Sequence, residues 1–221
     1  MRLYNFHSSS TSYRVRIALG LKELTYENIP VQLDWEAGDT DSEQFRRFNP
    51  QGNVPVLVDG ESRIAQSVAI LEYLEERYPR APLLPAQLER RARARSLVLF
   101  IACEMQPLGN LRTERFLSRA MHLGPVELRA WRRHWIARGL DVLEAELSGQ
   151  ATGGDYCLGG EPGVVDCFLI PQIYNALRPT VGLDLQVWPT LHRIYEACMK
   201  TAAFTLAHPT NQPGYQELQR H

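Results

Sequence analysis

The chain opens with the stretch MRLYNFHSSSTSYRVRIALGLKELTYENIPV (residues 1–31), which decides the fold of its first half. Residues 2–6 have the composition of a short strand, residues 11–22 that of a helix with an apolar side, and residues 25–31 that of a second strand. A strand, a helix and a strand in so short a span predict a right-handed βαβ unit with two parallel strands.

A hairpin and a second helix are expected to follow this unit. Residues 55–58 and 62–64 flank Asp59-Gly60, a dipeptide typical of tight turns, and so read as two paired strands. A helix is predicted to begin near Gln66, because apolar residues recur there at helical spacing. The first domain is therefore predicted as βαβ followed by ββα.

Three prolines between residues 79 and 85 mark a stiff break in regular structure. We expect a first domain over residues 1–80, a linker over 81–87 and an all-helical domain over 88–221. The helical periods in the last part cover residues 88–117, 127–147, 164–177 and 189–199.

Composition narrows the possible functions of the 221-residue chain. Its 24 Lys and Arg residues nearly balance 25 Asp and Glu residues, which argues against a nucleic-acid partner. No apolar run approaches the ~20 residues of a membrane-spanning helix, so no membrane partner is expected. The 4 cysteines and 6 histidines show no metal-ligand spacing, which predicts no metal site and favours reduced thiols in a cytoplasmic protein.

Five consecutive hydroxyl residues, 8–12, stand between the first strand and the first helix. One of them is expected to cap the helix, but a cap needs only one hydroxyl. The surplus hydroxyls, the amide N–H groups and the helix dipole together can stabilise a thiolate. No cysteine is near in sequence, so the thiolate would come from a ligand.

A second informative stretch is NPQGNVPVL, residues 49–57. Only ~5–6% of X-Pro bonds are cis, so in general a trans bond is expected between Val54 and Pro55. A cis bond would instead turn the N–H and C=O of Val54 outward, where an extended peptide could pair with them.

Gln66-Ser67 opens the second predicted helix, and Ser67 is expected to cap it. The amides and the dipole at that helix start would also suit a carboxylate. Taken in chain order, these three stretches would bind a thiol, a peptide backbone and a carboxylate, which are the groups of a small thiol-containing peptide.

Five segments together resemble the zeta class of glutathione transferases, the group that includes maleylacetoacetate and maleylpyruvate isomerases. They read SSSTSYRVRIALGLK, NPQGNVPVL, QSVAILEYLEERYP, QPLGNL and GEPGVVDCFLIPQIYNALRPTVGLDL, and they follow the order and spacing of that family over nearly the whole chain. The resemblance implies a thioredoxin-like N-terminal domain, a helical-bundle C-terminal domain, glutathione as cofactor and a homodimer.

Site residues follow from the same resemblance. It assigns thiolate handling, and hence catalysis, to Ser9, Ser10 and Thr11. It implies a cis bond between Val54 and Pro55. It assigns the binding of the remaining groups of glutathione to Asn53, Val54, Pro55, Gln66, Ser67, Gln106 and Asn110. Arg178 resembles an arginine near the substrate carboxylate, and Arg112 is a second candidate for that contact.

The chain departs from the family pattern at three positions. Ser8 stands where many members have arginine, so one cation for substrate carboxylates is missing, and Thr11 stands where many have cysteine. Gly163 replaces the usual Ser or Thr of a helix-capping box that ends in Asp166. Glycine is nearly as good a cap, so the fold should tolerate this change.

We expect glutathione-dependent cis-trans isomerisation of an unsaturated dicarboxylic keto acid, with glutathione regenerated. A conjugating or dehalogenating transferase is the first alternative, slightly favoured by Ser8 in place of arginine. A non-catalytic glutathione-binding protein of the same fold is the second, and the intact Ser9, Pro55 and Ser67 set argues against it.

Overall fold

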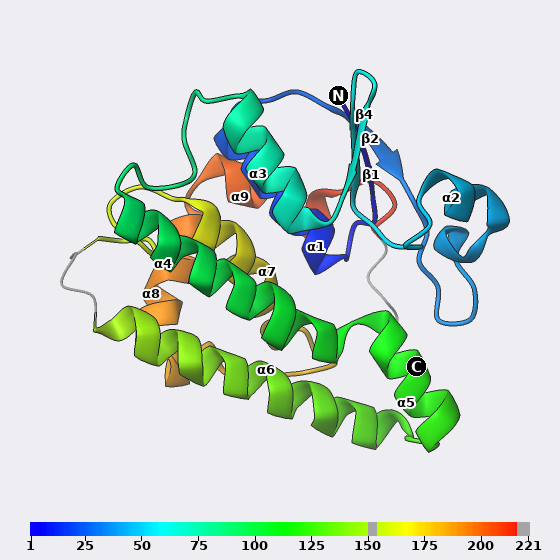
Figure 1. The fold of residues 1–221 in the computed structure, drawn as a ribbon. Helices are drawn as coiled ribbons and strands as arrows, with labels where there is room; N and C mark the ends of the chain where they lie inside the picture. Colours follow the sequence, from blue (N-terminus) through cyan, green and yellow to red (C-terminus); the bar gives the residue numbers. More distant parts are fainter. Residues whose placement is uncertain (150–153, 216–221) are drawn as a thin grey trace. The chain divides into compact units, whose positions relative to one another are not determined.

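The computed structural model describes residues 1–149 and 154–215 (Figure 1). The chain divides into two compact units. One comprises Met1–Leu83 together with Lys200–His221, and the other comprises Leu84–Met199.

The first unit contains the predicted strand and helix order. Its elements are β1 (Arg2–Asn5), α1 (Ser10–Leu21), β2 (Glu27–Pro30), α2 (Glu43–Phe48), β3 (Val56–Asp59), β4 (Ser62–Ala65), α3 (Ser67–Arg77) and α9 (Ala202–Ala207). The four strands form one sheet in the order β2-β1-β3-β4, with β1 parallel to β2 and antiparallel to β3. The βαβ-ββα prediction is confirmed, and α2 falls in a region to which the sequence assigned no element.

Helices cover both faces of this sheet. Leu3 pairs with Leu57 and both are fully buried, while the next pair, Tyr4 and Val56, points to the opposite face because strand side chains alternate. Phe45 of α2 packs in the same apolar cluster as Val56. Figure 1 accordingly shows α2 on one side of the sheet and α1 and α3 on the other.

The C-terminal segment was expected in the helical domain, as part of residues 88–221, and this expectation is wrong. Residues from Lys200 onward group with the first unit, where α9 lies against α1. The Tyr13 hydroxyl donates to the carbonyl of Phe204 at 3.2 Å, and both side chains are fully buried. The helices approach so closely that a Cβ at Gly20 would lie 3.2 Å from Ala203.

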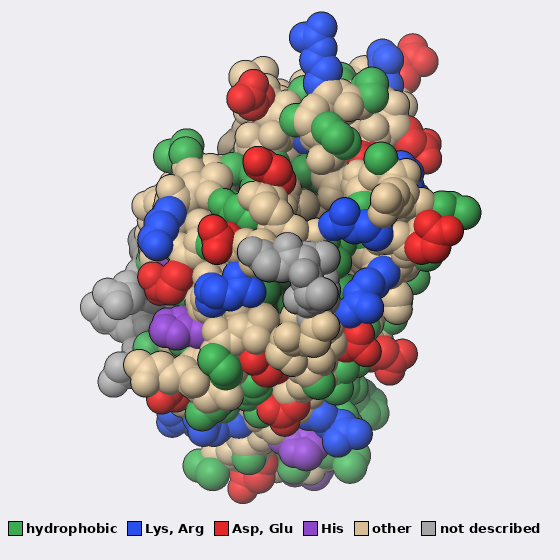
Figure 2. All heavy atoms as spheres, turned by 90° about the vertical axis from the view of Figure 1, so that its left-hand side faces the viewer, with side chains coloured by type: hydrophobic (Ala, Val, Ile, Leu, Met, Phe, Trp, Pro, Cys, Tyr) green, Lys and Arg blue, Asp and Glu red, His purple; other side chains and the backbone are tan. Residues whose placement is uncertain are grey.

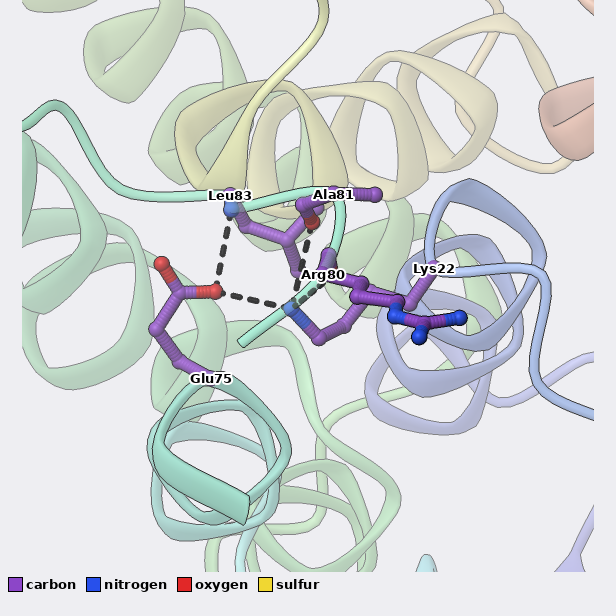
Figure 3. A network of polar contacts seen from close by, with 5 residues as sticks. All are labelled: Lys22, Glu75, Arg80, Ala81 and Leu83. Atoms are coloured by element: carbon purple, nitrogen blue, oxygen red, sulfur yellow. Dashed lines mark hydrogen bonds and ion pairs between the residues drawn. The ribbon is translucent and has the colours of Figure 1, made fainter. Parts of the chain in front are cut away.

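A buried ion pair holds the segment that follows α3 (Figure 3). The Lys22 Nζ lies 3.0 Å from the Glu75 carboxylate and donates to the carbonyls of Arg80 and Ala81 at 3.3 and 3.2 Å. The same Glu75 oxygen accepts the Leu83 N–H at 2.9 Å. Residues 80–83 are therefore anchored to the helices of the first unit, and the boundary between the two units falls directly after Leu83.

The second unit is helical in its described residues. Its elements are α4 (Leu88–Leu99), a π-helical turn (Phe100–Met105), a 3-10 turn (Gln106–Gly109), α5 (Leu111–Met121), α6 (Pro125–Ser148), α7 (Val164–Leu177), a 3-10 turn (Leu185–Val187) and α8 (Pro189–Met199). The fold class is confirmed as a thioredoxin-like domain and a helical domain.

The continuous helix expected over residues 88–117 is interrupted. Pro107 lies in the first turn of the 3-10 segment, where its missing N–H costs no hydrogen bond. Asn110 then starts a new helix, since its side-chain oxygen accepts the Thr113 N–H at 2.9 Å. The apolar period continues across the break, which is why periodicity alone did not show it.

Helix α7 forms the core of the second unit, and 11 of its 14 residues are buried. The side-chain cap absent at Gly163 is partly compensated by Asp166, whose carboxylate accepts the Gly163 N–H at 2.9 Å and the Cys157 N–H at 3.0 Å. Burial raises the pKa of Asp166, while these backbone donors lower it. The carboxylate ties the start of α7 to the loop before it.

No helix within residues 1–149 and 154–215 is long and apolar enough to cross a membrane. On the face drawn in Figure 2, acidic and basic side chains alternate without a large region of one sign.

Candidate functional site

Ser9 is the N-cap of α1. Its hydroxyl oxygen accepts the Ser12 N–H at 3.2 Å, and its carbonyl accepts the Tyr13 N–H at 2.9 Å. The amides of Ser10 and Thr11 precede that first intrahelical bond. The hydroxyl cluster therefore lies where amide donors and the positive end of the helix dipole converge, as expected for a site that holds a negative sulfur.

Hydrogen-bond geometry determines where the hydroxyl protons point in this cluster. Thr11 donates its single proton to the carbonyl of Val54 at 3.0 Å. The Ser9 and Thr11 hydroxyl oxygens are 2.8 Å apart, so Ser9 must be the donor in that contact. The structure thus links three candidate residues, Ser9, Thr11 and Val54, in one chain of hydrogen bonds.

The neighbouring serines differ from Ser9. The Ser10 side chain is buried, with 7% exposure. The Ser8 hydroxyl lies 2.7 Å from the Nδ1 of His7, and so the position where the family often has arginine carries a serine paired with an imidazole.

The Val54-Pro55 bond is cis, as the family resemblance implies and against the general preference for trans. The loop before it is held by Asn49, whose amide donates to the backbone and side-chain oxygens of Asn53 at 2.8 and 3.2 Å. Asn53, Val54 and Pro55 are thus presented from one ordered loop. The Val54 carbonyl is already bonded to Thr11, so one of its two acceptor positions is in use.

Gln66, and not Ser67, is the N-cap of α3, which corrects the expected cap. Gln66 has φ +72°, ψ 121°, a conformation that residues with a Cβ rarely adopt, and such strain clusters at ligand sites. Its exposed side chain donates to the Gln51 amide oxygen. The first intrahelical bond runs from Ile70 N–H to the Gln66 carbonyl, so the amides of residues 67–69 precede it.

Ser67 has a different partner from the one expected. Its hydroxyl oxygen accepts from Arg14 at 3.2 Å, and both side chains are nearly fully buried. A guanidinium therefore lies beside the amide-rich start of α3. Cation, dipole and amide donors together favour a carboxylate at this position.

In the second unit, Gln106 and Asn110 flank the break between α4 and α5. The side-chain oxygen of Gln106 accepts from Gln172 of α7 at 2.6 Å, and Gln172 is only 2% exposed. The side-chain oxygen of Asn110 caps α5. Both amides thus use their oxygens inside the second unit.

The two candidate substrate arginines lie at helix ends of the second unit. Arg178 is the C-cap of α7, with its guanidinium 5.9 Å from the centre of the Tyr174 ring, and Arg112 is exposed at the start of α5. The buried Glu114 carboxylate lies 2.5 Å from Arg132. Burial raises the pKa of Glu114, and Arg132 and then Arg178 oppose that increase, so Glu114 and Arg178 interact electrostatically.

The sequence analysis did not identify three residues that hydrogen-bond to the side chains of candidate site residues. These are Gln51, Arg14 and Gln172. Arg14 carried a usable signal, because a charged residue inside the apolar run of α1 indicates a buried polar partner. Gln51 and Gln172 carried no comparable signal, since each meets its partner only through tertiary packing.

In the described part of the chain, no cluster of three or more His, Cys, Asp or Glu side chains could hold a metal ion. Cys157, Cys167 and Cys198 are buried, and burial raises the pKa of Cys157 and Cys198. Buried thiols of this kind are poor nucleophiles, whereas the fourth cysteine, Cys103, is exposed.

Comparisons with known proteins agree on one family. Residues 1–76 match the glutathione S-transferase N-terminal domain, and residues 125–198 match the glutathione S-transferase C-terminal domain. A maleylacetoacetate isomerase of Pseudomonas aeruginosa is 41% identical over 96% of this chain and 98% of its own.

Solved structures give the same result. A maleylpyruvate isomerase, described as a bacterial zeta-class glutathione S-transferase, superposes with a TM-score of 0.93 at 38% identity, covering 98% of this chain and 100% of that one. A maleylacetoacetate isomerase of Methylobacterium extorquens, with malonate and glutathione bound, has a TM-score of 0.91 at 38% identity and the same coverage.

Proposed function

Because this chain belongs to the zeta class of the glutathione S-transferase family, we propose that it is a glutathione-dependent cis-trans isomerase of an unsaturated dicarboxylic keto acid, of the maleylacetoacetate or maleylpyruvate type. The observation that carries the proposal is the hydroxyl cluster at the start of α1, where Ser9, Thr11 and Val54 are hydrogen-bonded in sequence. Such an isomerase would serve tyrosine or aromatic-ring breakdown.

The donor set of the first unit fits glutathione. Amides and the Ser9 hydroxyl at α1 suit its sulfur, the ordered loop at Asn53 and Val54 suits its peptide backbone, and the start of α3 beside Arg14 suits its γ-glutamyl carboxylate. A relative of 38% identity was solved with glutathione bound, which supports this assignment.

Bound glutathione would supply a thiolate that adds to one carbon of the conjugated double bond. The former double bond is then single and can rotate. Expulsion of the thiolate restores the double bond and regenerates glutathione. The protein's part is to keep the sulfur ionised. The Ser9 hydroxyl, the α1 amides and the helix dipole all favour the charged form and so lower the thiol pKa.

Gln106 and Asn110 stay predicted glutathione residues, as the family resemblance implies. Arg178 and Arg112 would bind the substrate carboxylates and offset the negative charge that develops on the keto oxygen during addition. The malonate in the Methylobacterium relative is a dicarboxylate, which supports a site for this class of substrate.

The test uses the purified protein with maleylacetoacetate or maleylpyruvate, with and without glutathione. We expect isomerisation only when glutathione is present, and no net loss of glutathione after many turnovers. Retention on immobilised glutathione without turnover would instead indicate a binding protein and overturn the proposal.

A conjugating or dehalogenating transferase is the second candidate, and the observation that favours it is Ser8. The group at this position is a neutral hydroxyl paired with His7, so it does not provide the cation that many members use for a substrate carboxylate. Stoichiometric consumption of glutathione with chloroacetate, in which the thiolate displaces chloride and remains on the carbon as a stable thioether, would support this candidate.

We also propose that the protein acts as a cytoplasmic homodimer, as its family resemblance implies. Light scattering at micromolar concentration is expected to give twice the 25.2 kDa mass of one chain.

A further inference from the structure

Arg16 is a buried arginine of α1 that the proposed mechanism does not use. Its guanidinium is 1% exposed. Nη1 donates to the Asn5 side-chain oxygen at 2.9 Å and to the Phe6 carbonyl at 3.3 Å, and Nη2 donates to the His7 carbonyl at 2.9 Å. Nε donates to the Ala207 carbonyl at 3.0 Å.

Three of these four acceptors belong to the end of β1 and the loop that leads into the hydroxyl cluster. Helix side chains lean toward the N-terminus of their helix, which is why Arg16 reaches back to this loop. The Phe6 carbonyl also accepts the Ser9 N–H at 3.1 Å. Arg16 and Ser9 therefore share one acceptor, and the guanidinium fixes the turn from Phe6 to Ser9.

The fourth acceptor brings in the C-terminal segment. Ala207 is the last residue of α9, so a single side chain connects the loop before Ser9 with the end of a helix some two hundred residues later. Arg16 also acts on a neighbour electrostatically, because it helps burial to lower the pKa of His208.

We propose that Arg16 is a positioning residue for the thiolate site, which holds the Phe6–Ser9 turn so that the Ser9 hydroxyl and the α1 amides meet the glutathione sulfur. The inference rests on the proposed binding of glutathione at this site. The positive charge of Arg16, whose guanidinium contacts the loop before α1, also favours the ionised form of the sulfur.

Lys22, the C-cap of α1, is a matched control. It is likewise a buried cation that donates to two backbone carbonyls, those of Arg80 and Ala81. It follows the last residue of α1 and is separated from Arg16 by roughly 9 Å along the helix axis at 1.5 Å per residue. Removing either cation costs stability, but only Arg16 contacts the loop that carries Ser9.

The experiment compares Arg16→Met, Arg16→Lys and Lys22→Met with the wild type. It measures the pKa of the bound glutathione thiol from thiolate absorbance, the melting temperature, and kcat and KM for glutathione. For Arg16→Met we expect the thiol pKa to rise by about one unit, a roughly tenfold loss of thiolate, with kcat falling more than KM rises. Arg16→Lys should recover part of the effect, because an ammonium keeps the charge and can reach one of the carbonyls.

Lys22→Met is expected to lower the melting temperature and leave the thiol pKa unchanged. Equal shifts of thiol pKa in Lys22→Met and Arg16→Met would overturn the proposal, as would a wild-type thiol pKa in a folded Arg16 variant. If Arg16→Met does not fold, Arg16→Lys decides the question by the same readout. Failure of the proposed function is distinct, because wild-type protein would then bind glutathione without isomerising the keto acid, whereas the test of Arg16 compares the thiol pKa of the variants with that of the wild type.

Discussion

Ser9 combines a structural and a chemical task in one hydroxyl group. Its oxygen caps α1 by accepting the Ser12 N–H, while its proton is directed to Thr11. In the proposed complex this proton turns from Thr11 to the glutathione sulfur, so Ser9→Ala loses both the helix cap and the hydrogen bond to the thiolate. Removing one hydrogen bond to a charged group costs about 1.5–3 kcal/mol, so we expect the pKa of bound glutathione thiol to rise by about one to two units and isomerisation to slow ten- to a hundredfold.

Ser42 is the control for the loss of the cap. Its hydroxyl caps α2 by accepting the Phe45 N–H at 3.1 Å, much as Ser9 caps α1. Ser42→Ala and Ser9→Ala should each lose about 1 kcal/mol of unfolding free energy, whereas only Ser9→Ala should move the thiol pKa. Wild-type thiol pKa and rate in Ser9→Ala would show that the hydroxyl is only a helix cap. Ser10→Ala should do less than Ser9→Ala, because Ser10 is buried and lies beyond the cap.

Thr11 is expected to act through Ser9. Thr11→Val removes the acceptor of the Ser9 proton, so that proton becomes available to the sulfur, and the thiol pKa should stay level or fall by roughly half a unit. The lost bond to the Val54 carbonyl should cost about 1–3 kcal/mol of unfolding free energy. Thr11→Ser keeps the hydroxyl and should behave as wild type. A rise in thiol pKa as large as that in Ser9→Ala would mean that Thr11 itself donates to the sulfur.

At the scale of elements, Lys22 and Glu75 join α1, α3 and the segment that follows α3 (Figure 3). Glu75→Gln leaves a fully buried ammonium without its charged partner. Breaking a buried pair in this way typically costs about 3–5 kcal/mol, which should appear as a lower midpoint in urea unfolding. The neighbouring Glu76 is exposed, and Glu76→Gln should leave the midpoint unchanged. Equal midpoints for the two variants would contradict this role for the pair.

Helical periodicity in the sequence did not predict the break between α4 and α5. Helical periodicity extends over the π-helical and 3-10 turns because such turns keep apolar residues on nearly the same side. Pro107 and Asn110 were the local signals for an interruption, because proline lacks the backbone donor that a helix interior requires and asparagine is preferred at an N-cap. The break matters because Gln106 and Asn110 both lie in it.

At the scale of the whole molecule, α9 completes the thioredoxin-like unit. A fragment of residues 1–83 contains the whole sheet but lacks the Phe204 carbonyl, to which Tyr13 donates, and the Ala207 carbonyl, to which Arg16 donates. It also exposes the apolar surface covered by Phe204, and burying one such side chain contributes about 1.5–3 kcal/mol. We expect this fragment to lack cooperative urea unfolding by circular dichroism, since domains of this size have little stability to lose.

A peptide of residues 200–215 added in excess should restore part of the cooperative transition by mass action. A scrambled peptide of the same composition is the control. A fragment that unfolds cooperatively by itself, with the midpoint of the full chain, would show that α9 is dispensable for the first unit.

Local periodicity, turn residues and short motifs were enough to predict the βαβ-ββα order, the two-domain class, the cluster of hydroxyls and the family, although not α2 or the break between α4 and α5. Tertiary structure alone decided that α9 joins the first unit, that Ser67 bonds to Arg14 and that the Ser9 proton points to Thr11. Each of these depends on groups far apart in the chain, such as Arg16 and Ala207, whose meeting is set by packing and by the need to satisfy buried polar groups.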